Sequence, residues 1–301
     1  MKQNISPSTT ATLLLTAGLI SLLAYQTSAQ SYTLVDLTPN AASGVATDIS
    51  SGTVAGSSAA GIFSPASHAQ LWDGLVAADL HPAFLDDAAN KIVGRSAILG
   101  GSANLQVGWG AGATTGSRLA PMLWHGSAAS ATTLAIPFVN AGGQATATDG
   151  SQIVGYGTAL NRDGTAFGPS RGIVWDAATG AATDLGDGGN GAQVYGVGGG
   201  QQVGYVIKSL ATAALWKSSS KSLVTMQPNG AVMSVANATD GQRQVGYAGY
   251  DIRVRVEAAK GNKDARFYYA TVWTGTAASA INIHPYPVNS LPGVTLSHSY
   301  A

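Results

Sequence analysis

Few side chains of this sequence could carry chemistry. Its 301 residues include five His, 15 acidic residues of which only Glu257 is a glutamate, and no Cys. A chain without Cys has no disulfide, no thiolate metal site and no Cys nucleophile. It contains neither a G-x-S-x-G nucleophile turn nor an H-E-x-x-H metal helix. Acid–base or metal chemistry would therefore need His and Asp side chains that the fold brings together.

Two histidines occupy equivalent positions, His81 in Leu-His-Pro and His284 in Ile-His-Pro. On one rim of a repeat fold they could face a shared ligand or metal. A residue that recurs in one position more often serves the repeat itself, and we favour that interpretation. An enzymatic site would require at least two of His81, His284, Asp79 and Asp36 to converge within about 4 Å in a pocket.

Other polar clusters are better explained by turns. Asp184, Asp187 and Asn190 in DLGDGGNG could offer oxygens to Ca²⁺, but their spacing is not that of an EF-hand loop. Asp149 and Asp240 each precede Gly, as expected for side chains that accept local backbone hydrogen bonds. The sequence thus assigns no catalytic, metal-binding or cofactor-binding residue, and we expect no cofactor.

The segments that must position these residues form a repeat. Short segments ending in Trp recur at intervals of roughly 40 to 57 residues. Their tryptophans are Trp72, Trp124, Trp175, Trp216 and Trp273. A Val-Gly segment, Val-Ala-Gly in the first repeat, precedes each one, and the glycines are Gly56, Gly108, Gly155, Gly204 and Gly246. We expect these residues to anchor the repeats, with Trp packing between blades and Gly marking close backbone approach between neighbouring sheets.

Each repeat contains four short strand-like segments separated by Gly, Asn and Asp turns. This pattern predicts an all-β fold, a β-propeller of four-stranded antiparallel blades. Segment 32–39 resembles a fourth strand without its partners, and segment 294–299 resembles a first strand. We therefore predict five repeats plus a split sixth blade, in a six-bladed propeller that is C-terminally incomplete. Segment 86–96 is predicted to be an inserted hairpin, and 251–267 a second insertion.

The first 29 residues have the pattern of a secretory signal peptide. Lys2 precedes an apolar stretch of 14 residues, Ala11–Ala24, and small residues follow it. This stretch is too short for a permanent membrane span, so we expect no transmembrane segment in the mature chain. Residues 31–301 are predicted to form a single repeat domain. The formal net charge of +0 argues against binding to nucleic acid.

The repeats resemble the bacterial extracellular repeat proteins of the HAF family, which are often associated with PEP-CTERM sorting signals. The segments that carry the resemblance are QQVGY at 201–205, TAALW at 212–216 and WTGTAASAINIHP at 273–285. The resemblance extends over nearly all of 31–301 and implies an extracellular or cell-surface location. It implies no activity, and the Pro-Glu-Pro motif of the sorting signal is absent from this sequence.

We expect a secreted or cell-surface protein with a structural or ligand-binding role, whose partner is an extracellular protein or a glycan, and no intrinsic catalysis. Trp109, Tyr156, Tyr205 and Tyr247 could stack on a ligand, although their recurrence after Val-Gly favours packing. The alternative is an extracellular hydrolase or lyase with a site at the axial mouth of the propeller. That alternative rests on analogy between folds.

Overall fold

The computed structural model describes residues 36–37, 43–50, 52–59, 67–137, 141–159, 168–186, 188–256, 261–284 and 296–297. The chain divides into two compact units, Met1–Asp36 and Leu37–Ala301, and the fold described below is that of the second. The predicted signal peptide, 1–29, lies outside the described residues. Among the described residues, no helix has the length and apolar character that crossing a membrane requires.

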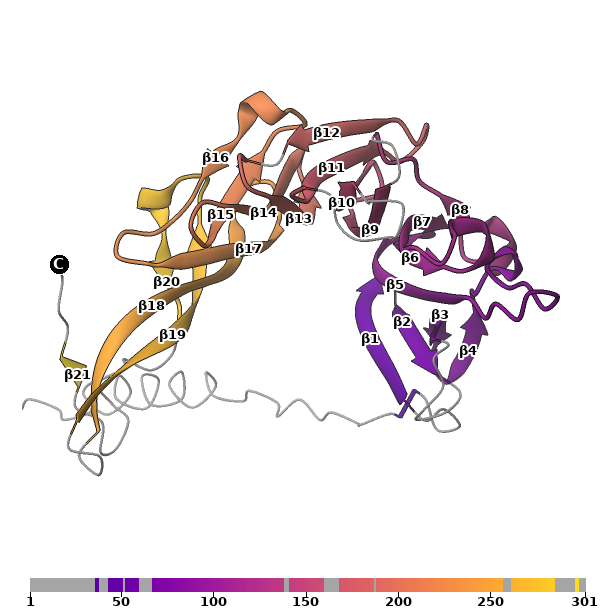
Figure 1. The fold of residues 1–301 in the computed structure, drawn as a ribbon, viewed down its shortest axis with the longest axis horizontal. Helices are drawn as coiled ribbons and strands as arrows, with labels where there is room; N and C mark the ends of the chain where they lie inside the picture. Colours follow the sequence, from indigo (N-terminus) through magenta and orange to yellow (C-terminus); the bar gives the residue numbers. More distant parts are fainter. Residues whose placement is uncertain are drawn as a thin grey trace, which may run out of the picture. The chain divides into compact units, whose positions relative to one another are not determined.

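Five sheets of antiparallel strands follow one another along the chain, each with its strands in sequence order (Figure 1). The first sheet contains β1 (Ser43–Ser50), β2 (Thr53–Ala59), β3 (Ser67–Asp73) and β4 (Val76–Asp79). The second contains β5 (Arg95–Ser102), β6 (Leu105–Ala111), β7 (Ala120–Trp124) and β8 (Thr132–Thr133). The third contains β9 (Ala141–Thr148), β10 (Gln152–Ala159), β11 (Arg171–Asp176) and β12 (Ala182–Gly186).

The fourth sheet contains β13 (Ala192–Gly198), β14 (Gln201–Ile207), β15 (Ala211–Trp216) and β16 (Val224–Thr225). The fifth contains β17 (Met233–Thr239), β18 (Gln244–Val256), β19 (Gly261–Trp273) and β20 (Ile281–Asn282). The 3-10 helices between strands are η1 (Ala83–Leu85), η2 (Ala113–Thr115), η3 (Ala128–Ser130), η4 (Ser220–Ser222) and η6 (Ala277–Ser279). The prediction of an all-β fold with five four-stranded repeats is confirmed.

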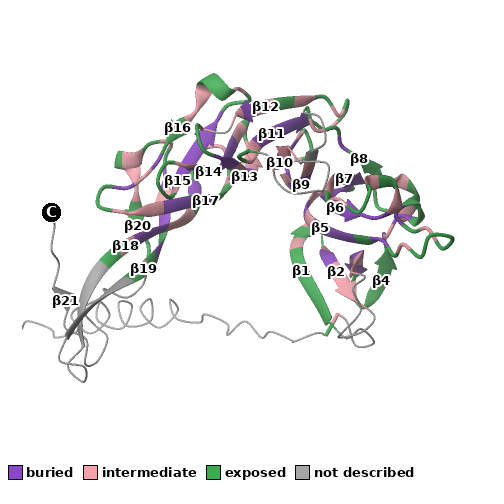
Figure 2. Ribbon diagram, in the orientation of Figure 1, coloured by how far each residue is buried: buried purple, intermediate pink, exposed green. Residues whose placement is uncertain are grey.

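The five tryptophans lie in the interior, at 2% exposure for Trp72 and 0% for the others. Trp124 of the second sheet shares a core cluster with Leu80 of the first sheet. Trp175, Trp216 and Trp273 each pack in the same way against the sheet that precedes theirs. Burial of a large ring at each junction stabilises the contact between successive sheets. In Figure 2, β15 is largely buried, whereas β1 and β4 are mostly exposed.

The glycine of each Val-Gly segment lies opposite a β-bulge in the first strand of its own sheet. In the fourth sheet, the register shifts between Val194 and Gly196 where β13 pairs with β14. A Cβ on Gly204 would lie 1.9 Å from the carbonyl oxygen of Gln193, and the equivalent glycines meet carbonyls at 1.9 to 2.0 Å. The prediction of close approach between neighbouring sheets was therefore wrong. The bulge instead presses a carbonyl of the same sheet against the glycine.

A buried glutamine before the Val-Gly pair closes the turn that follows the Trp strand. Gln202 is 0% exposed, and its Oε1 accepts the backbone N–H of Ser218 at 2.6 Å. Gln106 accepts the N–H of Gly126 at 2.8 Å, and Gln244 that of Gly275 at 2.7 Å. These side chains satisfy backbone donors of the turns and tie each turn to its own sheet.

Both predicted insertions are hairpins. A single bridge joins Asp87 to Ile92 in the second repeat. In the fifth sheet, β18 and β19 continue as one long antiparallel pair, from Gln244 opposite Trp273 to Val256 opposite Gly261. Figure 1 shows this pair extending well beyond β17 and β20.

The predicted sixth blade is described only in small part. β21 (Leu296–Ser297) pairs with β18 at Val254 and Arg253. It therefore joins the extended hairpin, whereas the sequence had assigned 294–299 to the first strand of a new sheet. Apart from residues 36–37, the predicted strand 32–39 lies outside the described residues.

Candidate functional site

Tyrosines in one repeated position line up over three successive sheets. Tyr156 on β10, Tyr205 on β14 and Tyr247 on β18 each follow the glycine of their Val-Gly pair, and all three are half-buried. Trp109 on β6 occupies the same position in the second sheet and is also half-buried. Successive side chains of a strand alternate between its two faces, so equal positions place these rings on equal faces of their sheets.

A fourth tyrosine, Tyr195, joins the row because it is the extra residue of the β13 bulge. Its ring lies 5.7 Å from that of Tyr205, tilted by 59°, and its hydroxyl donates to Gln193 Oε1 at 2.7 Å. Gln144 Nε2 donates to the hydroxyl of Tyr156 at 2.6 Å. We call Tyr156, Tyr195, Tyr205 and Tyr247 the tyrosine cluster. The sequence analysis missed Tyr195, since nothing in the sequence marked the bulge.

Three hydroxyls of the cluster are held in the protonated form. Burial raises the pKa values of Tyr156, Tyr195 and Tyr205 above the ordinary value of tyrosine. Interactions with Tyr205, and more weakly with Tyr156 and Tyr247, raise the pKa of Tyr195 further. The cluster therefore offers neutral hydroxyl donors, amide groups and partly exposed ring faces, which suit stacking against an uncharged ligand.

A second polar group surrounds His81, whose side chain is 4% exposed. Its Nδ1 lies 2.8 Å from Ser96 Oγ, and its ring stacks on that of His68 with centroids 4.0 Å apart. Asp79 binds His68 Nδ1 through Oδ2 at 2.7 Å and accepts the His81 backbone N–H through Oδ1 at 2.8 Å. Asp79 and His81 are thus brought together, but the Asp79 carboxylate bonds to the His81 backbone and to the ring of His68.

The contact between His81 and Ser96 is a repeated junction between sheets. Ser96 Oγ accepts the N–H of Ala69 at 3.0 Å, and Ser96 is 0% exposed. At the junction between the fourth and fifth sheets, Ser234 Oγ accepts the N–H of Ala213 at 2.9 Å and donates to Gln227 Oε1 at 2.5 Å. Gln227 precedes Pro228 as His81 precedes Pro82. This equivalence, with a serine inaccessible to substrate, favours a structural role for His81.

Acidification is expected to weaken this junction. Burial lowers the pKa of His81 below its ordinary value, and His68 lowers it further, although Asp86 and Asp79 act in the opposite direction. Below about pH 6.5 the unfolded chain binds a proton that the folded chain does not, so the free energy of unfolding falls until the folded pKa is reached. Urea unfolding from pH 8 to pH 5 should show a shallower pH dependence for His81→Gln, with similar stability to wild type at pH 8.

A matched control is Gln227→His, which should acquire a pH dependence of the same sign. Identical pH profiles for wild type and His81→Gln would contradict the assignment of the proton-linked loss to His81.

Two other predicted candidates, His284 and Asp184, have partners away from His81. His284 packs edge-on against Tyr269 in the fifth sheet, with ring centroids 5.5 Å apart. Asp184 pairs with Arg171 at 2.7 Å and accepts the N–H of Gly186, and Asp187 lies outside the described residues. Within the described ranges, no three His, Asp or Glu side chains are grouped as a metal ion requires.

Fold and site together define an all-β repeat protein with an aromatic surface shared by successive sheets. No family model matches the sequence, and no curated protein matches it. Among solved structures, a protein assigned as TolB from Agrobacterium tumefaciens is 8% identical at a TM-score of 0.43, over 71% of this chain and 76% of that one. A puromycin hydrolase is 15% identical at a TM-score of 0.35, over 74% of this chain and 42% of the hydrolase.

Proposed function

We propose that this chain is an exported, extracellular or cell-surface protein of the HAF repeat type that binds an uncharged glycan at the tyrosine cluster. The observation that carries the proposal is the equivalent, half-buried position of Tyr156, Tyr205 and Tyr247 on three successive sheets. The ring of Tyr195 adds to it, 5.7 Å from that of Tyr205. A half-buried tyrosine offers an apolar ring face and a polar hydroxyl. Sugars match this surface, because one face of a sugar ring is apolar and hydroxyl groups surround it. The alternative ligand is a protein whose surface is rich in aromatic and amide groups. Binding experiments distinguish it from a glycan.

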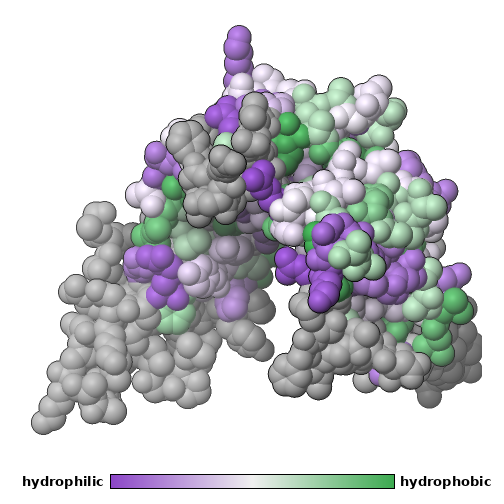
Figure 3. Space-filling view, turned by 45° about the vertical axis from the view of Figure 1, so that its right-hand side comes forward, coloured by the Kyte–Doolittle hydropathy of each residue, from purple (hydrophilic) through white to green (hydrophobic). Residues whose placement is uncertain are grey.

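The charge distribution supports a neutral ligand. The formal net charge is +0, and charged residues make up 10% of the sequence. Figure 3 shows hydrophilic and hydrophobic residues interspersed over the described surface in that view. This low and balanced charge gives a strongly charged partner little electrostatic attraction.

The proposal includes a β-propeller completed by a sixth sheet. It is supported because the first and fifth sheets expose positions that are buried wherever two successive sheets pack together. Ile283 of the fifth sheet is 54% exposed, whereas the equivalent residues Leu80, Leu134 and Met226 are at most 7% exposed. Each of these four donates its N–H to the same position of the neighbouring Trp strand. Ala46 of the first sheet is exposed, whereas its equivalents Ile98, Ala145, Val194 and Ala236 are at 0%. Both faces have the character of a surface that packs on a further sheet.

Tyr205→Ala is expected to weaken glycan binding about tenfold, because it removes the ring at the centre of the cluster. Tyr205→Phe should lose less, since the stacking face remains. The measurement is a glycan array with purified protein, followed by titration of the best ligand. Phe84→Ala, which truncates an aromatic ring of the first repeat that is 38% exposed, serves as the matched control and should bind like wild type. Absence of glycan binding above background would refute the proposal, and capture of a protein ligand that depends on Tyr205 would replace it.

A further inference from the structure

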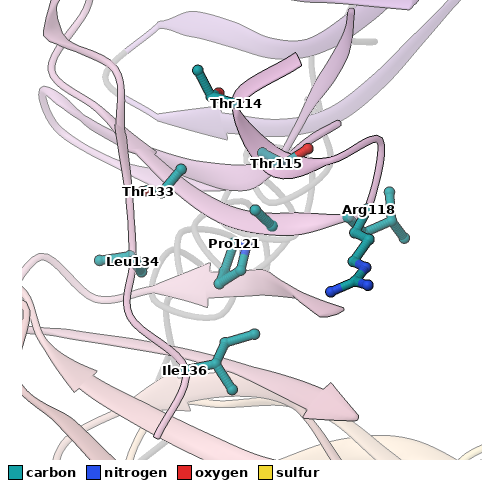
Figure 4. A pocket seen from close by; sticks show the side chains of 9 residues that line it. Thr114, Thr115, Arg118, Pro121, Thr133, Leu134 and Ile136 are labelled. Atoms are coloured by element: carbon teal, nitrogen blue, oxygen red, sulfur yellow. The ribbon is translucent and has the colours of Figure 1, made fainter. Parts of the chain in front are cut away.

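A pocket separate from the tyrosine cluster lies in the second repeat, beside η2, β7 and β8. Its volume is about 270 Å³. Its lining includes Thr114, Arg118, Pro121, Thr133, Leu134 and Ile136. Figure 4 shows Leu134 and Arg118 on opposite sides of Pro121, with Ile136 on a third side. The pocket therefore joins a cationic side to an apolar one.

The guanidinium of Arg118 has no partner among the described residues. The arginine ion pairs of the described part are Arg171 with Asp184, at 2.7 Å, and Arg266 with Asp251, at 2.6 Å. Arg118 takes part in neither pair, although its side chain is half-buried. A guanidinium beside a pocket presents paired N–H donors that fit a carboxylate bidentately, and a charge-assisted bond of this kind is among the stronger hydrogen bonds in proteins.

The other lining residues indicate the chemical character of the rest of the ligand. Pro121, Leu134 and Ile136 offer apolar surface, whereas the hydroxyls of Thr114 and Thr133 have no hydrogen-bond partner in the described part of the chain. Thr115 is already engaged, since its hydroxyl bonds with the backbone of Gly112. One cation neutralises one negative charge, and apolar walls favour an apolar body. The volume corresponds to about nine molecules of liquid water, which limits the ligand to roughly ten non-hydrogen atoms.

We infer that this pocket binds a small monocarboxylate with an apolar body, its carboxylate on the Arg118 guanidinium and its body against Leu134, Pro121 and Ile136. The hydroxyls of Thr114 and Thr133 also line the pocket, where they can donate to the ligand. The site is independent of the tyrosine cluster, so either can exist without the other.

The test is isothermal titration calorimetry of the full chain with 3-phenylpropanoate and with its neutral amide. The acid should bind saturably, and the amide at least tenfold more weakly, because it lacks the charge that Arg118 recognises. Arg118→Gln should weaken binding of the acid at least tenfold, and Thr133→Val a few-fold. Arg243→Gln removes an exposed arginine of the fifth repeat and should leave binding unchanged.

Three results would overturn the inference. They are equal binding of acid and amide, unaltered binding by Arg118→Gln, and no saturable heat up to about 10 mM acid. Arg118→Gln should retain both the melting temperature of wild type and any glycan binding, which separates loss of this site from unfolding and from failure of the tyrosine cluster.

Discussion

Gly204→Ala is expected to disrupt the fourth sheet. The new Cβ would lie 1.9 Å from the carbonyl oxygen of Gln193, 2.8 Å from Cα of Val194 and 2.9 Å from the Gln193 carbonyl carbon. All three are backbone atoms of β13, so no side-chain movement can relieve the contact. Relief requires loss of the bulge or separation of β13 from β14, and we expect the free energy of unfolding to fall by more than about 4 kcal/mol. Urea unfolding followed by circular dichroism measures this loss, and failure to purify folded protein would represent its upper extreme.

Gly180→Ala is the matched control. Gly180 lies in the turn between β11 and β12 with φ of +70°, and an added Cβ would meet no heavy atom within 4 Å. Its alanine variant bears only the cost of a left-handed conformation, about 1 to 2 kcal/mol, and Gly180→Asn should cost less because Asn tolerates that region. A Gly204→Ala loss no larger than that of Gly180→Ala would contradict the backbone-contact argument.

The sequence predicted the number and order of the strands within the five sheets, because the spacing of each repeat indicates them. Each repeat needs a large ring at one position and a glycine at another, so Trp and Val-Gly recur there. Turns of Gly and Asp separate the strands that carry them. The bulges could not be predicted, since the extra residues share no chemical type: Thr47, Leu99, Thr146, Tyr195 and Asn237. A bulge is set by backbone pairing between two strands, and its only trace in the sequence is the glycine opposite it. Because the bulge was not foreseen, the sequence analysis expected the glycine to lie close to the neighbouring sheet, whereas it lies against a carbonyl of its own sheet.

The candidate site was predictable only in part. Tyr156, Tyr205 and Tyr247 share a repeated position, so the sequence identified them, although it favoured packing over binding. Tyr195 was missed because it enters the cluster through a bulge. The partner of His81 was also beyond sequence analysis, since Ser96 lies on the next sheet. A partial signal was present: Ser96 and Ser234 occur where the preceding Trp strand has an N–H to satisfy, at Ala69 and Ala213, although Ala192 opposite Gly172 does not follow this pattern. Where that strand instead has Pro121, which has no N–H, the equivalent residue is Gly143.

Trp124→Ala is expected to lower the free energy of unfolding by about 3 to 5 kcal/mol, through loss of a fully buried ring at the junction of the first two sheets. The phenylalanine variants separate the ring from its N–H. Trp124 Nε1 donates to the carbonyl of Leu80 at 2.9 Å, and Trp175 Nε1 to that of Ala135 at 2.6 Å. The indole nitrogens of Trp216 and Trp273 are buried and have no partner among the described residues.

Trp124→Phe should therefore cost more than Trp216→Phe, by about 1 to 3 kcal/mol. The first leaves a buried carbonyl without its donor, whereas the second removes a donor that has no acceptor in the described part of the chain. Both variants lose the same ring volume, so chemical unfolding of the two, measured side by side, isolates the hydrogen bond from the packing. Equal losses would mean that the indole N–H contributes nothing at the Leu80 junction, and that the tryptophans recur for their size alone.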